Sequence, residues 1–402
     1  MTIRVRYLGG LVAGLLLGVA LPLAGGDTGR VLVDLTGLVV TVARFLMFPL
    51  FFSGMIIAVD ELRSDRQLVA VAGHGALWTA VAVIVSTLVG VLGVAVLSPE
   101  RIPPMIQEGQ AVVAPSVLAA VVEGIPNNLF QVFVIHESAA GGILLVAFLI
   151  GMSLQYDRNI TSPISLVADS ANRILYRLNS LLVNWLGVLL IIPAAASVVL
   201  LREVENLGIF LQLLLVIVVA VLLVGFVLFP LTIFLVQRDR DETISWIKSM
   251  LAPLVPALVT GDSYAAVGTL VRSSKEDMDV HRRIGATALP VVTIFGRGGS
   301  ALVGIAGTLL VIRSYTALEI GVGPMVGLAV AAMAFSFLLA RAPGNGVVLI
   351  LSYLALLYGR GLEESYLILL PVMPLLERLG AVLDVMTAGF VTQMIQVYAA
   401  QK

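Results

Sequence analysis

Six ionisable residues interrupt long apolar stretches in the carboxy-terminal half of the chain, and all of them but Arg378, which we expect to snorkel or face other helices, are candidates for a site. They are the acids Asp262, Glu377 and Asp384 and the bases Arg297, Arg341 and Arg378. A lone charge at the centre of a membrane span costs about 2.5 to 3.5 kcal/mol, so each needs an opposite charge, water or a ligand. Glu377 and Asp384 lie seven positions apart, nearly two helical turns, and share one helix face. We therefore expect a charged site at membrane depth.

The composition predicts that these charges belong to an all-α polytopic membrane protein. Hydrophobic residues make up 59% of the chain and charged residues 12%, whereas a soluble domain carries about 25% charged residues. The mean hydropathy is +1.05. A net charge of -1 without a long basic run gives no sign of a nucleic-acid partner.

The residue inventory excludes several kinds of site. The chain has no cysteine, so it has no disulfide, thiolate metal site or cysteine nucleophile. Its three histidines are scattered, and we expect no metal site and no cofactor. His136 and Glu137 lack the base-orienting partner of a catalytic group, so we expect no enzymatic activity.

Two interrupted apolar segments position the polar residues. The arms Leu251–Thr260 and Ala265–Val271 flank Gly261, Asp262 and Ser263, and each is shorter than the roughly 20 residues of a spanning helix. This pattern predicts a re-entrant helical hairpin. Val322–Ala340 and Val347–Tyr358 flank a second tip that contains Pro343, Gly344 and Gly346. Two such segments in corresponding positions are typical of inverted-repeat transporters, with a binding site at the tips.

The remaining apolar segments predict eight spanning helices. We expect them at residues 7–24, 31–58, 68–97, 129–154, 164–200, 207–236, 284–312 and 366–398. Arginines concentrate in alternate loops, so the positive-inside rule predicts a cytoplasmic amino terminus. A cleaved signal peptide is the alternative for Leu8–Leu23, but no small-x-small cleavage site follows it.

Several short motifs, in order, resemble those of the dicarboxylate/amino acid:cation symporter family, the glutamate transporter homologues. They are Arg44–Leu50, Ile125–Phe130, Ala257–Thr260, Leu289–Pro290, Pro343–Gly346 and Val382–Asp384. The resemblance covers nearly the whole chain. It implies an elevator-type transporter with eight transmembrane helices, two re-entrant hairpins and inverted repeats, assembled as a homotrimer in the cell inner membrane.

The resemblance also implies a division of the chain. Residues 1–66 and 98–206 would form the scaffold. The sliding domain would comprise helix 3 (67–97), helix 6 (207–240), hairpin 1 (241–279), helix 7 (280–315), hairpin 2 (316–363) and helix 8 (364–402).

The seventh helix departs from the family pattern at its sodium motif. Where the family has Asn-Met-Asp-Gly-Thr, this chain has Gly296, Arg297, Gly298, Gly299 and Ser300, so an acid is lost and a cation is gained. We interpret Arg297 as a tethered cation that pairs with Asp384, Asp262 or a substrate carboxylate. The alternative is a structural salt bridge in a carrier that uses another ion. Gly296 and Ser300 remain candidates for ion binding, and coupling to Na⁺ or H⁺ stays open.

The eighth helix keeps Asp384 where the family binds a substrate amino group, but Thr387 stands where the family has arginine. A purely structural ion pair is the alternative role for Asp384. Arg341 and Glu377 are candidates for a gate or a charge pair. The predicted substrate-binding residues are Asp262, Ser263, Arg297, Gly344, Asn345, Gly346, Asp384 and Thr387.

These residues predict a secondary active carrier of small amino acids or carboxylates. Two other classes remain open: an anion channel or leak on the same fold, which the arginines would serve, and a substrate sensor that has lost transport.

Overall fold

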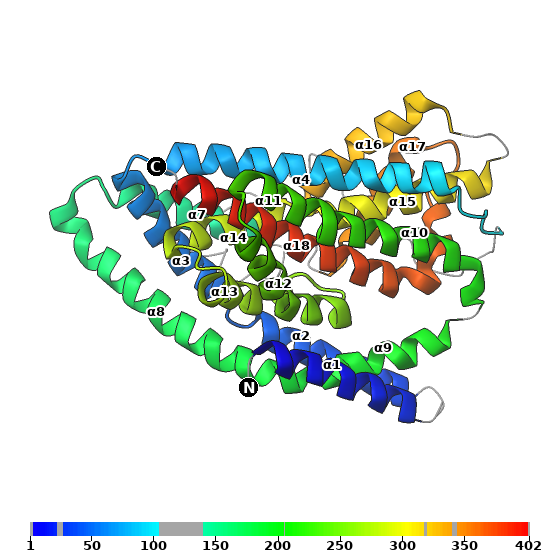
Figure 1. Ribbon diagram of the computed structural model, residues 1–402, viewed down its shortest axis with the longest axis horizontal. Helices are drawn as coiled ribbons and strands as arrows, with labels where there is room; N and C mark the ends of the chain where they lie inside the picture. Colours follow the sequence, from blue (N-terminus) through cyan, green and yellow to red (C-terminus); the bar gives the residue numbers. More distant parts are fainter. Residues whose placement is uncertain are drawn as a thin grey trace.

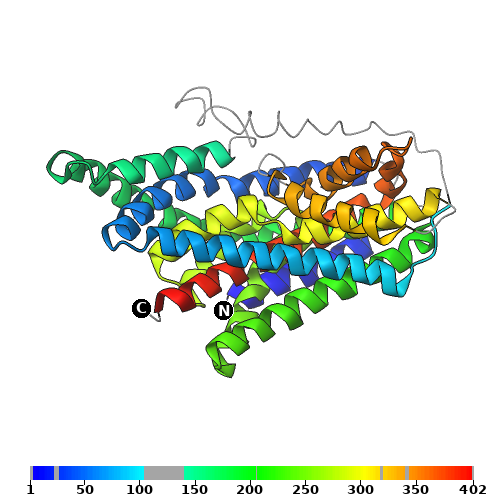
Figure 2. The same cartoon turned by 90° about the horizontal axis from the view of Figure 1, so that it is seen from above.

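The computed structural model describes residues 3–21, 27–103, 140–204, 206–316, 320–339 and 344–400, and all their regular elements are helices. Within them, eight helical segments are long and apolar enough to cross a membrane, at 3–20, 29–64, 68–97, 158–203, 207–237, 240–260, 282–315 and 365–399. Most long helices run along the long axis of the molecule (Figures 1 and 2). The predicted all-helical membrane fold is confirmed. Arg341 and the Ile125–Phe130 motif lie outside the described residues.

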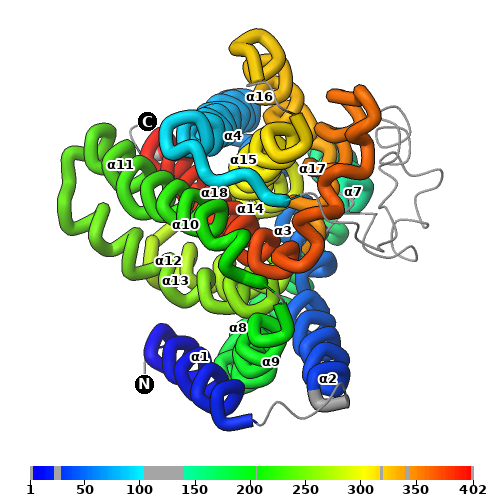
Figure 3. The backbone as a smooth tube through the Cα atoms, turned by 90° about the vertical axis from the view of Figure 1, so that its right-hand side faces the viewer, coloured from blue at the N-terminus to red at the C-terminus, as the bar shows by residue number. Residues whose placement is uncertain are grey.

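One group of helices lies together on one side of the molecule. It contains α1 (Ile3–Ala20), α2 (Asp27–Arg44), α8 (Arg158–Leu189) and α9 (Ile191–Glu203) (Figure 3). Glycines of α1 allow this packing, because a β-carbon at Gly10 would lie only 2.1 Å from the carbonyl oxygen of Gly187. Small residues at helix contacts are typical of membrane bundles, where backbones approach closely.

A second group of helices packs around α15 (Gly298–Tyr315), the most deeply buried of them. It contains α4 (Leu68–Leu97), α10 (Leu211–Leu222), a π-helical turn (Leu223–Leu228), α11 (Phe229–Gln237), α14 (Arg282–Phe295), α15 and α18 (Met373–Ala400). Helix α15 packs against both α4 and α18. Helices α3 (Met47–Ser64) and α7 (Ala140–Ser153) pack on each other, and both also contact α14.

The first hairpin consists of α12 (Arg240–Thr260), a short turn of helix (Tyr264–Ala266) and α13 (Val267–Glu276). The side chain of Asp239 accepts hydrogen bonds from the amides of Asp241 and Glu242, so α12 begins there. The expectation of an arm from Leu251 that is too short to span was wrong, since α12 has 21 residues. Gly261, with φ of 71°, ends this arm, and α13 packs back against α12.

The second hairpin consists of α16 (Val322–Ser336) and α17 (Gly346–Tyr358), which pack against each other. Gly344 lies at the described part of its tip with φ of 78°. Neither arm is long enough to cross a bilayer alone. A 3-10 segment (Ser365–Val372) then leads into α18, while another (Leu207–Phe210) precedes α10.

Candidate functional site

A break between α14 and α15 creates the centre of the site. Gly296 and Arg297 have non-helical backbone angles. The last hydrogen bond of helix α14 is donated by the amide of Gly296 to the carbonyl of Val292. The first amides of α15 therefore have no partner within their own helix. The side chain of Arg297 projects from this break into the protein interior, where the residue is 1% exposed.

Asp384 of α18 binds both Arg297 and the beginning of α15. Its Oδ2 lies 3.0 Å from the Nε of Arg297 and 2.7 Å from the hydroxyl of Ser300. Its Oδ1 accepts from the amides of Gly299 at 2.7 Å and Ser300 at 2.9 Å. The positive end of the α15 dipole thus adds to the attraction of the guanidinium. Both oxygens of this carboxylate are occupied by donors.

The second hairpin lies directly against this ion pair. A β-carbon built on Gly346 would lie 2.5 Å from the hydroxyl of Ser300 and 2.6 Å from Nη2 of Arg297, so only glycine fits at this position. Arg297 therefore contacts Gly346, the first residue of α17.

Glu377 holds the same end of α17. Its carboxylate accepts from the amides of Val347 at 3.1 Å and Val348 at 2.8 Å. Sequence reasoning offered Glu377 as a gate or charge pair, whereas its hydrogen bonds are those of a helix cap supplied by another helix.

The tip of the first hairpin makes a second ion pair. Asp262 is 2% exposed, and its Oδ2 lies 2.5 Å from the Nε of Arg44, at the end of α2. Its Oδ1 accepts from the amide of Tyr264 at 2.9 Å. A β-carbon at Gly344 would lie 3.5 Å from Nη2 of Arg44 and 3.7 Å from the β-carbon of Asp262. The end of α2 and both hairpin tips therefore meet at one point.

Three buried hydroxyl groups near these pairs differ in their bonding. Among the described residues, Ser263 Oγ and Ser86 Oγ are buried without a hydrogen-bond partner. Ser86, on α4, lies beside the helix break, 3.1 Å from a β-carbon built on Gly298. The hydroxyl of Thr387 donates to the carbonyl of Leu383 in its own helix at 2.8 Å.

The structure therefore separates the predicted site residues into two clusters. Arg297, Ser300, Gly346 and Asp384 form one, with Gly296 in the break beside them and Asn345 next to it at the amino end of α17. Asp262 and Gly344 form the other, with Ser263 adjacent in the chain. Arg297 binds Asp384, and Asp262 binds Arg44, so the alternative pairing of Arg297 with Asp262 is not the one found.

Three residues in or beside the two ion pairs were not predicted from the sequence as part of the site. Arg44 was noted only within a motif, although a charge in the middle of the predicted span 31–58 was a signal. Ser86 and Tyr264 gave no signal in the sequence. Tyr264 is fully buried and within electrostatic range of Arg297, Asp262, Arg44 and Asp384.

Within the described residues, no group of histidine and acidic side chains is arranged to hold a metal ion. The family model described as the Sodium:dicarboxylate symporter family matches residues 3–397. No individual curated protein matches the chain.

Proposed function

Because the chain belongs to the sodium:dicarboxylate symporter family, we propose that it carries small amino acids or carboxylates with Arg297 in the place of a coupling cation. The chain is a multi-pass membrane transporter, and symporters of this family are not enzymes.

The ion pair of Arg297 and Asp384 is the observation that carries this proposal. Both side chains are almost completely buried, at 1% and 2% exposure, so the guanidinium is a permanent positive charge inside the protein. A sodium ion beside Asp384 would be repelled by this guanidinium and would find both carboxylate oxygens already bound to donors. The residues of this break therefore fit a fixed cation better than an exchangeable one.

The substrate carboxylate would bind between the two hairpin tips. Ser263 offers a buried hydroxyl, and the tip from Gly344 to Gly346 offers backbone amides beside Arg297. A carboxylate accepts such charge-assisted hydrogen bonds well. Because donors already occupy both carboxylate oxygens of Asp384, this residue is better suited to hold Arg297 than to bind a substrate amino group. The hydroxyl of Thr387 is bonded within α18, so Thr387 would contribute packing.

Transport would follow from sliding of one helix group against the other. Residues 1–66 and 98–206 would form the scaffold of a homotrimer, and the remaining segments would move. The separate grouping of α1, α2, α8 and α9 in Figure 3 supports this division for those four helices, whereas α3 and α7 of the proposed scaffold also contact α14. The arginine-rich loops support a cytoplasmic amino terminus in the inner membrane. Hairpin 2 would close over substrate before the sliding step.

The first test is thermal stability of the purified protein with amino acids and dicarboxylates, in sodium, in potassium and at two pH values. A ligand at a hundred times its Kd adds about 2.7 kcal/mol to the folded state. We expect equal stabilisation in sodium and potassium. Stabilisation that requires sodium would disprove the role of Arg297 as a substitute cation.

Exchange in proteoliposomes then separates the three classes. Saturable counterflow of labelled substrate is expected of a carrier. An ion current without counterflow would identify an anion channel, and substrate binding without exchange would identify a sensor.

A further inference from the structure

A hollow of about 380 Å³ lies away from the substrate site, between helices proposed above to form the scaffold and helices proposed to move. One wall comes from α3 and α8 and the other from α13 and α14. Its lining includes Leu50, Tyr176, Val271, Lys275, Leu289 and Pro290. No function proposed above uses this hollow.

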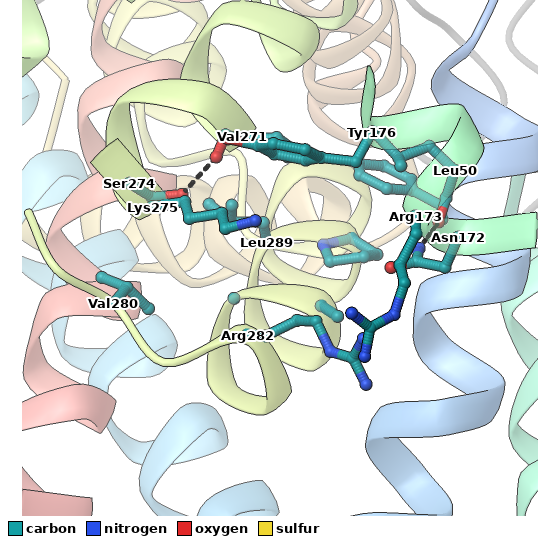
Figure 4. A pocket seen from close by; sticks show the side chains of 14 residues that line it. Leu50, Asn172, Arg173, Tyr176, Val271, Ser274, Lys275, Val280, Arg282 and Leu289 are labelled. Atoms are coloured by element: carbon teal, nitrogen blue, oxygen red, sulfur yellow. Dashed lines mark hydrogen bonds between the residues drawn. The ribbon is translucent and has the colours of Figure 1, made fainter. Parts of the chain in front are cut away.

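Three basic side chains converge on the hollow from three helices. Arg173 comes from α8, Lys275 from α13 and Arg282 from α14. In Figure 4, Arg173 and Arg282 approach each other on one side, and Lys275 extends toward the hollow from the other. They lie on the side of the molecule that the arginine distribution predicts to be cytoplasmic.

The acids around the hollow do not balance these bases. Arg282 binds Asp169 at 2.5 Å and Glu61 at 2.9 Å, and Arg173 shares Asp169 at 2.9 Å. On the other side, Arg272 binds Glu276 at 2.8 Å, and Tyr176 donates to the same carboxylate.

Lys275 supplies the remaining charge. Its Nζ lies 3.8 Å from the centre of the Tyr176 ring. No ion pair joins Lys275 to an acid in the described part of the chain. The charged side chains that line the hollow are Arg173, Lys275 and Arg282, and within the described residues only the two arginines are paired with acids, so the charge of Lys275 is the one left to a ligand.

We propose that this hollow binds an anionic phospholipid with a single negative charge on its phosphodiester. The phosphate would lie at Lys275, between the Tyr176 ring and the guanidinium of Arg282. The apolar side chains Leu50, Val271 and Leu289 would contact an acyl chain. A bilayer leaflet that carries anionic lipids attracts such basic sites, and a phosphodiester contributes one charge, as the charge of Lys275 requires.

A lipid in this place would contact α3 and α8 of the proposed scaffold and α13 and α14 of the proposed moving part at once. If these parts slide as proposed above, the lipid would stabilise the arrangement seen here. Lipid binding itself does not depend on that sliding, so the two can be tested separately.

The test compares the full-length, delipidated protein with short-chain phosphatidylglycerol, short-chain phosphatidylcholine and inorganic phosphate. Readouts are the rise in Tm and the bound lipid seen by native mass spectrometry. We expect phosphatidylglycerol to raise the Tm, and the other two probes to leave it unchanged. An equal rise with phosphatidylcholine, or with phosphate alone, would overturn the proposal.

Variants locate the site. Lys275→Gln should weaken the apparent affinity for phosphatidylglycerol about tenfold, as expected for loss of one charge-assisted contact. Lys275→Arg should retain binding. Lys248→Gln is the matched control, because Lys248 is also an exposed lysine of the first hairpin but does not line the hollow. Equal affinity in the Lys275→Gln and Lys248→Gln variants would rule out this hollow. Stabilisation by substrate, measured in the same preparations, reports separately on the carrier function.

Discussion

Arg297 and Asp384 are 87 positions apart in the chain, yet the guanidinium Nε lies 3.0 Å from the carboxylate Oδ2 at the amino end of α15. The pair joins the break after α14 to α18 and has no net charge. Because Ser300 and two backbone amides bind the same carboxylate, the first turn of α15 is fixed to α18. This arrangement allows the proposed cation role of Arg297 to be tested directly.

Replacement of Arg297 by methionine should create a requirement for an added cation. The change leaves Asp384 buried without its counter-charge, and removal of one partner from a buried pair costs about 3–5 kcal/mol. We expect a lower Tm that sodium partly restores, whereas the Tm of the unmodified protein should not depend on sodium. Arg313→Met, in the last turn of α15, is the control. If sodium changes the Tm of neither variant, Arg297 does not take the place of a sodium ion.

A methyl group at position 346 should disturb the pair from the side of the second hairpin. The new β-carbon would lie 2.6 Å from Nη2 of Arg297, so either the guanidinium or α17 must move. We expect Gly346→Ala to weaken substrate binding at least tenfold, a change of about 1.4 kcal/mol, in a titration of Tm against substrate. Gly323→Ala, in α16 of the same hairpin, should have no effect because nothing lies within 4 Å of its β-carbon. Wild-type affinity in Gly346→Ala would mean that the tip is not part of the binding site.

Arg44 and Asp262 should be energetically coupled. Hydrogen bonds between charged groups contribute about 1.5–3 kcal/mol, and Asp262 is almost fully buried. Arg44→Gln and Asp262→Asn should each lower the free energy of unfolding. The double variant should lose less than the sum, by about 0.5–3 kcal/mol. Additive losses would show that the two side chains act independently.

Glu377 should stabilise the second hairpin as a cap. Glu377→Ala leaves two buried amides of α17 without acceptors, which costs about 1–3 kcal/mol. Glu377→Gln keeps one acceptor oxygen and should lose less. Thermal unfolding measures both, with exposed Glu364→Gln as the control. If Glu377→Gln were as destabilising as Glu377→Ala, charge rather than capping would be the main contribution.

Much of the fold could be predicted because long apolar segments and two interrupted ones are strong signals in a membrane protein. The start of α12 could not be found by hydropathy, because its first turns are polar and begin at the cap Asp239. The break after Phe295 falls inside the single span predicted at 284–312, at the glycines that surround Arg297, a cluster that helices tolerate poorly.

The site was predictable only where a buried charge demanded a partner. Asp384 was among the partners expected for Arg297. The partner of Asp262 was not expected, because Arg44 is 218 positions away and no local spacing relates them. Thr387 was predicted to bind substrate, and that stays a prediction; its hydroxyl donates to Leu383 in the preceding turn, as helical threonines readily do.

The two ion pairs differ in how they would respond to membrane voltage. Moving one elementary charge across 100 mV involves about 2.3 kcal/mol. Arg297 and Asp384 both lie in segments proposed to move, so the field does no net work on them as a pair. Asp262 has its counter-charge on α2, a segment proposed to stay fixed. Of the two pairs, only the one at Asp262 would therefore contribute to electrogenic behaviour of the empty carrier, because sliding separates its opposite charges.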